Sequence, residues 1–223
     1  MVKVSTVNKM ESLTKYFTSK EIMTFYVAHP SDSYFVEGVP PIEMVEVVPY
    51  NHLWPNIYEN IASIIKQKLG VNVETIDHIG STAIPEIAAK PIIDIDLSVC
   101  DSENEQCYLP ALEELGFKLV VREPRFYGHR LFHLENPRVN LHVFTFRSPE
   151  AIRHLLFRNW LRESEEDRQV YINAKLDAVK GCELDIEKYH KNKQDMVHYI
   201  YQKIFQALGF INVEDEHEIS KFK

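Results

Sequence analysis

Apolar residues follow two different periods along this chain, and the period predicts the type of element at each place. Apolar residues at every second position, or short segments rich in β-branched residues, are typical of strands because successive strand side chains point to opposite faces. Such segments are 45–48, 73–79, 90–99, 117–121, 129–134 and 140–146. The last two are separated by a short segment that contains Pro137, so we expect them to form a β-hairpin.

Apolar residues spaced three and four apart predict helices in other parts of the chain. One apolar stripe covers 55–69 and ends at Gly70, and a second helix is expected over 103–115. Residues 149–208 show helical spacing, and one or two amphipathic helices are expected near the N-terminus. These patterns divide the chain into an N-terminal arm, an α/β core, a helical C-terminal part of the same domain and an acidic tail, at 1–42, 43–148, 149–208 and 209–223.

The segment 73–99 carries the strongest chemical signal. Asp94 and Asp96 are two apart on an expected strand, so both carboxylates project from one face while apolar residues fill the other. Buried like charges need a counter-charge, and Mg²⁺ is commonly held by one or two carboxylates plus substrate phosphates. Gly80 lets the backbone come close to a ligand, and the Ser81 hydroxyl suits a phosphate. Solvated residues of an edge strand are the alternative for the two aspartates.

The order of strand, Gly-Ser and Asp-x-Asp resembles the signature of the nucleotidyltransferase superfamily, which has the polymerase-beta-like fold. The longer string HIGSTAIPEIAAKPIIDID, with VEVVPYNHLWP upstream, is similar to the GrpB family (UPF0157) within that superfamily. Tyr171 with Lys175 and Tyr189 with Lys193 match the helical half of the same pattern. The resemblance covers residues 45–208 and implies an α+β fold: a nucleotidyltransferase-like mixed β-sheet with flanking helices, followed by a C-terminal helical region.

This resemblance implies a metal-dependent transfer of a nucleotidyl group from a nucleoside triphosphate to an unknown acceptor. Asp94 and Asp96 would hold the divalent metal, Mg²⁺ or Mn²⁺, while Gly80 and Ser81 would cradle the β- and γ-phosphates. Basic residues that are candidates for contacts with phosphate or acceptor are Lys90, Arg158, Arg162, Lys175 and Lys193. A solvated surface position is the alternative for each of these basic residues.

His142 lies about where the superfamily usually places its third carboxylate, so it is a candidate catalytic residue and metal ligand. Three roles are open: a metal ligand, for which imidazole suits Mn²⁺ better than Mg²⁺, a general base toward the acceptor, or a residue of a degenerate site that binds without catalysing. Two other functions therefore compete with the enzyme. One is a non-catalytic nucleotide- or CoA-like ligand-binding module of the same fold, and the other is an interaction protein whose arm recruits a partner.

The amino-acid composition limits the classes of binding partner and the cellular compartment that we expect for this protein. The 223 residues carry a net charge of −8, with 45% hydrophobic and 26% charged residues, which is typical of a globular protein and argues against binding long nucleic acid. Widely spaced cysteines, no signal-peptide pattern and no membrane-spanning segment predict a reduced, cytoplasmic protein. Some proteins that resemble GrpB are fused to dephospho-CoA kinases, but this sequence contains neither GxGxxG nor the kinase phosphate loop GxxxxGK[ST].

Overall fold

The computed structural model of the chain describes residues 2–27, 34–37, 46–179 and 186–211, and for residues 179 and 186–193 it describes the backbone alone. The described residues form two compact units. One unit takes its residues from Met1–Phe25, Ile42–Val47 and Ile152–Lys223, and the other from Tyr26–Pro41 and Val48–Ala151. The division into arm, core, helical part and tail that the sequence predicts stays a prediction, and most of the tail lies outside the described residues.

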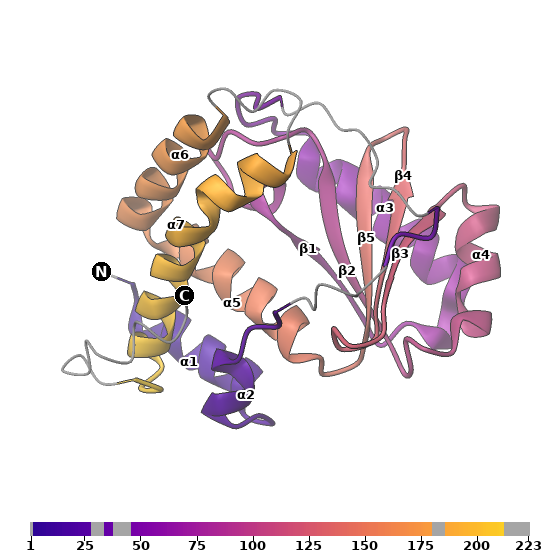
Figure 1. Ribbon diagram of the computed structural model, residues 1–223, viewed down its shortest axis with the longest axis horizontal. Coiled ribbons are helices and arrows are strands. Elements are labelled where there is room, and N and C mark those ends of the chain that lie inside the picture. Colours follow the sequence, from indigo (N-terminus) through magenta and orange to yellow (C-terminus); the bar gives the residue numbers. More distant parts are fainter. Residues whose placement is uncertain (1, 28–33, 38–45, 180–185, 212–223) are drawn as a thin grey trace. The chain divides into compact units, whose positions relative to one another are not determined.

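A five-stranded mixed β-sheet forms the centre of the second unit (Figure 1). In spatial order its strands are β1 (Thr75–Ile79), β2 (Ile93–Val99), β5 (Val139–Thr145), β4 (His129–Leu134) and β3 (Lys118–Glu123). β2 and β5 run parallel, and the other neighbouring pairs are antiparallel. The predicted α+β class with a mixed sheet is therefore confirmed, and β2, which carries both aspartates, is an interior strand.

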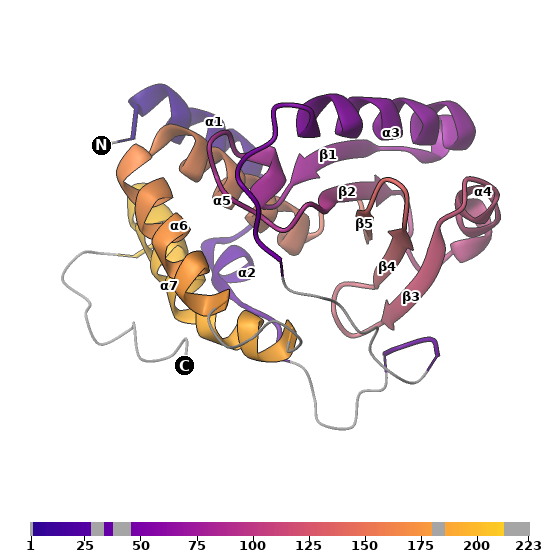
Figure 2. The same cartoon turned by 90° about the horizontal axis from the view of Figure 1, so that it is seen from above.

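One face of this sheet is apolar and is covered by α3 (Trp54–Leu69) and α4 (Leu109–Glu114) (Figure 2). Ile95 and Leu97 of β2 and Leu141 of β5 are fully buried there, as the alternation of the sequence predicts. Each buried leucine or isoleucine side chain stabilises the fold by about 1.5–3 kcal/mol. Burial of these apolar side chains thus fixes the orientation of β2 and β5, and the polar side chains of both strands project from the other side of the sheet.

Two predicted elements differ from the observed ones. The helix expected over 103–115 is instead a 3₁₀ turn, Glu105–Cys107, followed by the shorter α4. Pro110 lies in the first turn of α4, and because proline lacks an N–H group it cannot continue a helix from the preceding turn. The described part of the β-like segment 45–48, residues 46–48, is not a strand, and its Val48 forms an isolated bridge with Ala89.

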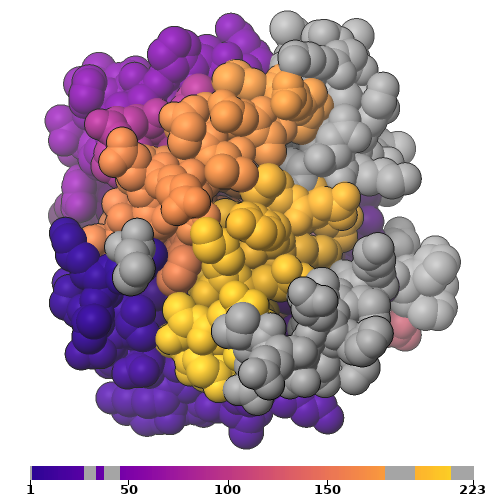
Figure 3. Space-filling model, turned by 90° about the vertical axis from the view of Figure 1, so that its left-hand side faces the viewer, coloured from indigo at the N-terminus to yellow at the C-terminus, as the bar shows by residue number. Residues whose placement is uncertain are grey.

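The first unit is helical. Its elements are α1 (Val4–Thr14), α2 (Ser19–Met23), most of α5 (Pro149–Glu163), α6 (Glu165–Val179) and α7 (Ile186–Ala207). The last two pack side by side and are orange and yellow in Figure 3. These helices agree with the helical spacing of the N-terminal residues and of 149–208. Within the described residues, no helix combines the length and the apolar character needed to cross a bilayer.

A buried arginine joins the N-terminal helices to α5. Arg153 is fully buried, and its Nη1 donates hydrogen bonds to the carbonyl oxygens of Ile22 at 3.0 Å and Thr24 at 2.9 Å. Its guanidinium carbon lies 5.1 Å from the centre of the Phe25 ring, a cation–π contact. These carbonyls lie at the C-terminal end of α2, where helix carbonyls lack partners within the helix. Arg153 therefore caps α2 and holds residues 19–25 in this unit.

A second buried charge joins α5, α6 and α7. The carboxylate of Asp167 accepts hydrogen bonds from Trp160 Nε1 at 2.7 Å and Ser164 Oγ at 2.9 Å, and it pairs with Lys203. Burial by itself raises the pKa of Asp167, but the bonds from Lys203, Trp160 and Ser164 outweigh it and bring the pKa below its ordinary value. Asp167 is therefore held as a carboxylate for structural reasons.

Candidate functional site

The residues that the sequence singles out on β2 and β5 meet on the polar face of the sheet. In the parallel pairing of these strands, Asp96 lies opposite His142 and Asp94 lies opposite Asn140. On the other side, Asp96 lies opposite Asp77 of β1. Directly opposed residues project from the same face of a sheet. Asp77, Asp96 and His142 thus form one row across three strands, with Asp94 and Asn140 in the next row.

Asp94 is fixed by two neighbours. Its Oδ1 accepts a hydrogen bond of 3.0 Å from Asn140 Nδ2. Gly80 lies against the same carboxylate with φ of 67°, and a Cβ atom on Gly80 would lie 3.0 Å from Cβ and Cγ of Asp94 and closer still to Oδ2. Only glycine adopts this backbone conformation readily and leaves room for the carboxylate. Ser81 follows at the start of a short 3₁₀ turn, Ser81–Ala83.

Asp96 is the more deeply buried of the two aspartates, with 3% of its surface exposed. Among the described residues, its Oδ1 atom is a buried oxygen without a hydrogen-bond partner, although the residue as a whole has other interactions. A buried carboxylate oxygen is costly unless positive charge approaches it. This oxygen and the neighbouring Asp94 carboxylate are hard oxygen donors of the kind that Mg²⁺ and Mn²⁺ take, so the pair fits a divalent cation.

His142 belongs to a chain of hydrogen bonds that crosses β5, β4 and β3. Its Nδ1 lies 3.0 Å from Nε2 of His129, and Nδ1 of His129 lies 2.6 Å from Oε2 of Glu123. His129 is buried, with 5% of its surface exposed. The two imidazole rings are stacked, with centroids 5.2 Å apart. The His142 ring is thus connected, through His129, to the Glu123 carboxylate on the side that faces away from β2.

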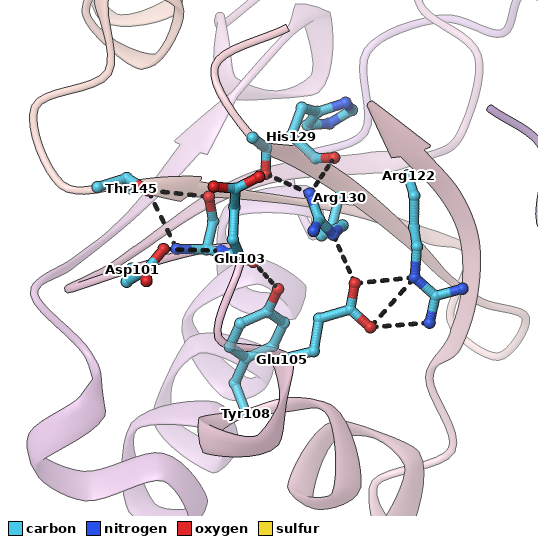
Figure 4. Close-up of polar contacts among 10 residues, drawn as sticks. Asp101, Glu103, Glu105, Tyr108, Arg122, His129, Arg130 and Thr145 are labelled. Atoms are coloured by element: carbon cyan, nitrogen blue, oxygen red, sulfur yellow. Dashed lines mark hydrogen bonds and ion pairs between the residues drawn. The ribbon is translucent and has the colours of Figure 1, made fainter. Parts of the chain in front are cut away.

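An ion-pair network holds the backbone at the start of β4 (Figure 4). Arg130 donates from Nη1 to the carbonyl oxygens of Gly128 at 2.9 Å and His129 at 3.3 Å, and from Nε to Glu105 at 2.6 Å. Glu105 also accepts bonds from Arg122, from Nε and Nη2 at 2.8 Å each. The hydrogen bond from Arg122, together with Arg130, lowers the pKa of Glu105 to about 2 despite its partial burial. The network therefore anchors the residue that carries the His129 ring.

Comparison with known proteins decides the family. The family model described as GrpB protein matches residues 44–203, which is more than half of the chain. The chain belongs to the GrpB family. Two relatives, the UPF0157 proteins of Halalkalibacterium halodurans and Streptomyces coelicolor, are each 36% identical to it over 159 and 160 residues. These matches cover 71% and 72% of this chain and 82% and 84% of the relatives.

Solved structures and more distant relatives agree with this assignment. The crystal structure of the conserved protein GrpB from Enterococcus faecalis superimposes with a TM-score of 0.65 at 29% identity, covering 72% of this chain and 98% of that one. A protein named dephospho-CoA kinase from Mycolicibacterium paratuberculosis is 26% identical over 185 residues. That match covers 71% of this chain and 46% of the kinase. The GrpB-like region is thus one part of that longer protein.

The basic residues that the sequence proposes do not all belong to the unit that contains the sheet. Lys90 is half-buried and lies just before β2, in the same unit as Asp94 and Asp96. The other candidates, which belong to the helical unit, are Arg158, Arg162, Lys175 and Lys193. Their contact with phosphate stays a prediction.

The environments of these helical residues differ from one another. Arg162 is exposed, and Arg158 donates from Nε to Asn159 at 3.1 Å. Lys175 has only 3% of its surface exposed, and its ammonium lies 5.5 Å from the centre of the Tyr171 ring. A solvated surface position therefore does not describe Lys175. Lys193 lies on α7, and its side chain lies outside the described residues.

Three residues of the polar face do not stand out in the sequence: Asp77, Glu123 and His129. The sequence does contain a signal for His129, namely the predicted hairpin. Pairing its two strands outward from the turn places Leu131 opposite His142, and His129, two residues from Leu131, then lies on the same face as His142. Glu123 and Asp77 require the order of the strands, since β3 pairs with β4 and β1 pairs with β2. The alternation of apolar and polar residues does not show which strands pair, so it predicts neither of these two contacts.

Proposed function

We propose that this GrpB-family protein is a metal-dependent nucleotidyltransferase of the polymerase-beta-like superfamily, which moves a nucleotidyl group from a nucleoside triphosphate to an acceptor. The observation that carries the proposal is the placement of Asp94 and Asp96 on one face of an interior strand, beside Gly80 and opposite His142. The spacing of Gly-Ser and Asp-x-Asp agrees with the superfamily signature, and the geometry brings these residues together in one unit.

Asp94 and Asp96 are the residues that would hold Mg²⁺ or Mn²⁺. The described residues contain no group of three or more histidine, cysteine, aspartate or glutamate side chains arranged as a complete metal site. Such a group is not required for Mg²⁺, which commonly takes one or two carboxylates and completes its shell with water and substrate phosphates. A bound cation would neutralise phosphate charge and stabilise the charge that develops during transfer. We therefore expect metal and triphosphate to bind together.

The remaining groups of the polar face would position the reactants. Asn140 orients the Asp94 carboxylate, and Gly80 lies against that carboxylate. Ser81 follows Gly80 directly, and its hydroxyl and amide suit the β- and γ-phosphates. Lys90 would add a positive charge from the same unit. Attack on the α-phosphorus would then depend on positioning more than on covalent chemistry by the protein. The exposed thiols of Cys100 and Cys107 fit a reducing, cytoplasmic setting for this reaction.

The second candidate function is a non-catalytic module that binds a nucleotide or a CoA-like ligand. Histidine at position 142, where the superfamily usually has a third carboxylate, favours this alternative. The relative named dephospho-CoA kinase also contains a GrpB-like region within a longer chain. Such a region can serve ligand binding for another activity. Both functions require the polar face to bind a phosphorylated ligand, but only the enzyme requires a transferable α-phosphorus.

Thermal unfolding against a panel of ligands tests this proposal. The four nucleoside triphosphates and CoA are each added with Mg²⁺, with Mn²⁺ or without metal, to the wild type and to Asp94→Asn/Asp96→Asn. We expect at least one triphosphate to raise the melting temperature of the wild type by several degrees only when metal is present, since a ligand at about 100 times its Kd stabilises by about 2.7 kcal/mol. The double variant should lose this response.

A charge-matched control separates the site from general electrostatics. Glu113→Gln/Glu135→Gln removes two exposed carboxylates from the same unit and should keep the full ligand response. A response to CoA in place of the triphosphates would favour the binding module. If no triphosphate shifts the wild type with either metal, the nucleotidyltransferase proposal fails.

A further inference from the structure

Glu123, His129 and His142 form a continuous polar chain that no predicted role explains. Glu123 ends β3 and pairs with His129, the first residue of β4, while His142 lies in β5 opposite Leu131. Because strand residues two apart share a face, all three side chains lie on the polar face of the sheet. The distances of 2.6 Å and 3.0 Å are hydrogen bonds at both links.

We infer that Glu123 and His129 are positioning residues that fix His142 in the tautomer protonated at Nδ1, with a lone pair on Nε2. An ionised carboxylate only accepts hydrogen bonds, so Nδ1 of His129 must donate to Glu123. Neutral His129 then accepts at Nε2, and Nδ1 of His142 must donate to it. When Glu123 is ionised and both histidines are neutral, the chain of bonds therefore sets the direction of every proton.

Packing keeps the middle ring of this chain in place. His129 stacks on Phe144 with centroids 4.8 Å apart and 25° between the planes, and it forms a T-shaped contact with Phe126, with centroids 5.6 Å apart. Arg130 holds the carbonyl oxygen of His129 itself, and Glu105 holds Arg130. A buried ring that is stacked and hydrogen-bonded at both nitrogens cannot rotate without losing these contacts. Its orientation is thus passed on to His142.

The tautomer of His142 determines which atom this residue offers on the polar face, where His142 lies opposite Asp96. Nδ1 of His142 faces His129, so Nε2, on the other side of the ring, points away from it. A lone pair at Nε2 makes His142 an electron-pair donor, which can bind a cation or accept a proton, whereas an N–H there could do neither. The use made of that lone pair rests on the proposed nucleotidyl transfer. The tautomer itself does not, because it is argued from the two hydrogen bonds that join His142, His129 and Glu123, with both histidines neutral.

Nuclear magnetic resonance reads the tautomer directly in the protein without nucleotide or metal. Long-range ¹H–¹⁵N correlations distinguish a protonated ring nitrogen from one that carries a lone pair, and His142→Gln assigns the signals of His142. At about pH 8, where imidazole is ordinarily neutral, we expect protonated Nδ1 and unprotonated Nε2 for His142 in the wild type. A wild-type spectrum with the proton on Nε2 would overturn the inference, without the need for any variant.

Removal of the carboxylate tests the direction of the chain. In Glu123→Leu the acceptor for His129 is lost, so His142 should exchange between both tautomers, whereas Glu135→Leu at the exposed turn after β4 should leave it unchanged. A fixed Nδ1–H tautomer that persists in Glu123→Leu would contradict the role of Glu123. Absence of any triphosphate response in the melting experiment would defeat the proposed enzyme, yet it would leave the tautomer result standing, so the two failures are distinguishable.

Discussion

Gly80 shows how a single residue shapes the site. Its positive φ of 67° turns the chain after β1, and its missing side chain leaves the space that the Asp94 carboxylate occupies. Asn140 holds the other side of this carboxylate. A glycine at this position therefore serves two purposes, the backbone conformation and the close approach, and a matched pair of substitutions separates them.

We expect Gly80→Ala to destabilise the protein more than Gly70→Ala. Both glycines have positive φ, 67° and 55°, in backbone regions that residues with a side chain rarely adopt, so both alanines bear a backbone cost of about 1–3 kcal/mol. At Gly70 nothing lies within 4 Å of the added methyl group, whereas at Gly80 it collides with Asp94. The collision should add about 1–3 kcal/mol, the usual cost of overpacking. Urea unfolding of both variants measures the difference, and equal losses would contradict the contact.

At the scale of elements, the Glu105 network joins the 3₁₀ turn before α4 to β3 and β4. Arg122 comes from β3, Arg130 from β4 and Glu105 from the turn Glu105–Cys107. Arg130 is buried, so removal of its carboxylate partner would leave a positive charge away from water. The network thus links the stability of this edge of the sheet to pH.

We expect Glu105→Gln to lower the free energy of unfolding by about 2 kcal/mol near neutral pH, the usual value of hydrogen bonds to charged groups. The folded-state pKa of about 2 lies below the ordinary value of 4.5, so Glu105 stabilises the fold fully above 4.5, and this stabilisation is lost as pH falls toward 2. The difference between wild type and variant should therefore shrink over that range. Urea unfolding at several pH values measures it.

An exposed ion pair provides the control for this pH series. Glu114 pairs with Lys68 at the surface, and the hydrogen bond from Lys68 lowers its pKa. Because solvent screens exposed pairs, Glu114→Gln should change stability much less than Glu105→Gln. A Glu105→Gln variant whose deficit stays constant from neutral pH down to pH 2 would contradict the assigned pKa.

The sequence predicts some elements of this fold better than others, for physical reasons. Helix α3 and strand β2 have long, regular apolar patterns, and both lie where the pattern places them. The helix expected over 103–115 is shortened because Pro110 must lie in a first turn. Strand order is a property of the folded sheet, so the links of His129 to Glu123 and of Asp77 to Asp96 depend on pairings that no local pattern encodes.

At the scale of the whole molecule, the site residues proposed from the sequence fall in two units. The aspartates, Gly80 and His142 belong to the sheet unit, whereas Arg158 and Lys175 belong to the helical unit. The GrpB family model covers residues from both, since it extends from 44 to 203. Local alternation predicts that Asp94 and Asp96 share one face of their strand, and the observed pairing of β2 with β5 places His142 on that same face. The basic helical residues belong to the other unit, so the alternation of the strands does not bear on them.

The position of a transferred label distinguishes the proposed nucleotidyl transfer from phosphoryl transfer and from ligand binding without reaction. The protein is incubated with Mg²⁺ or Mn²⁺, a fractionated cell extract as the source of acceptors, and a triphosphate labelled at either the α- or the γ-phosphorus. We expect the α-label to appear on an acceptor, with release of pyrophosphate, and Asp94→Asn to abolish it while the fold persists. Transfer of the γ-label, or full α-transfer by Asp94→Asn, would exclude nucleotidyl transfer that depends on Asp94.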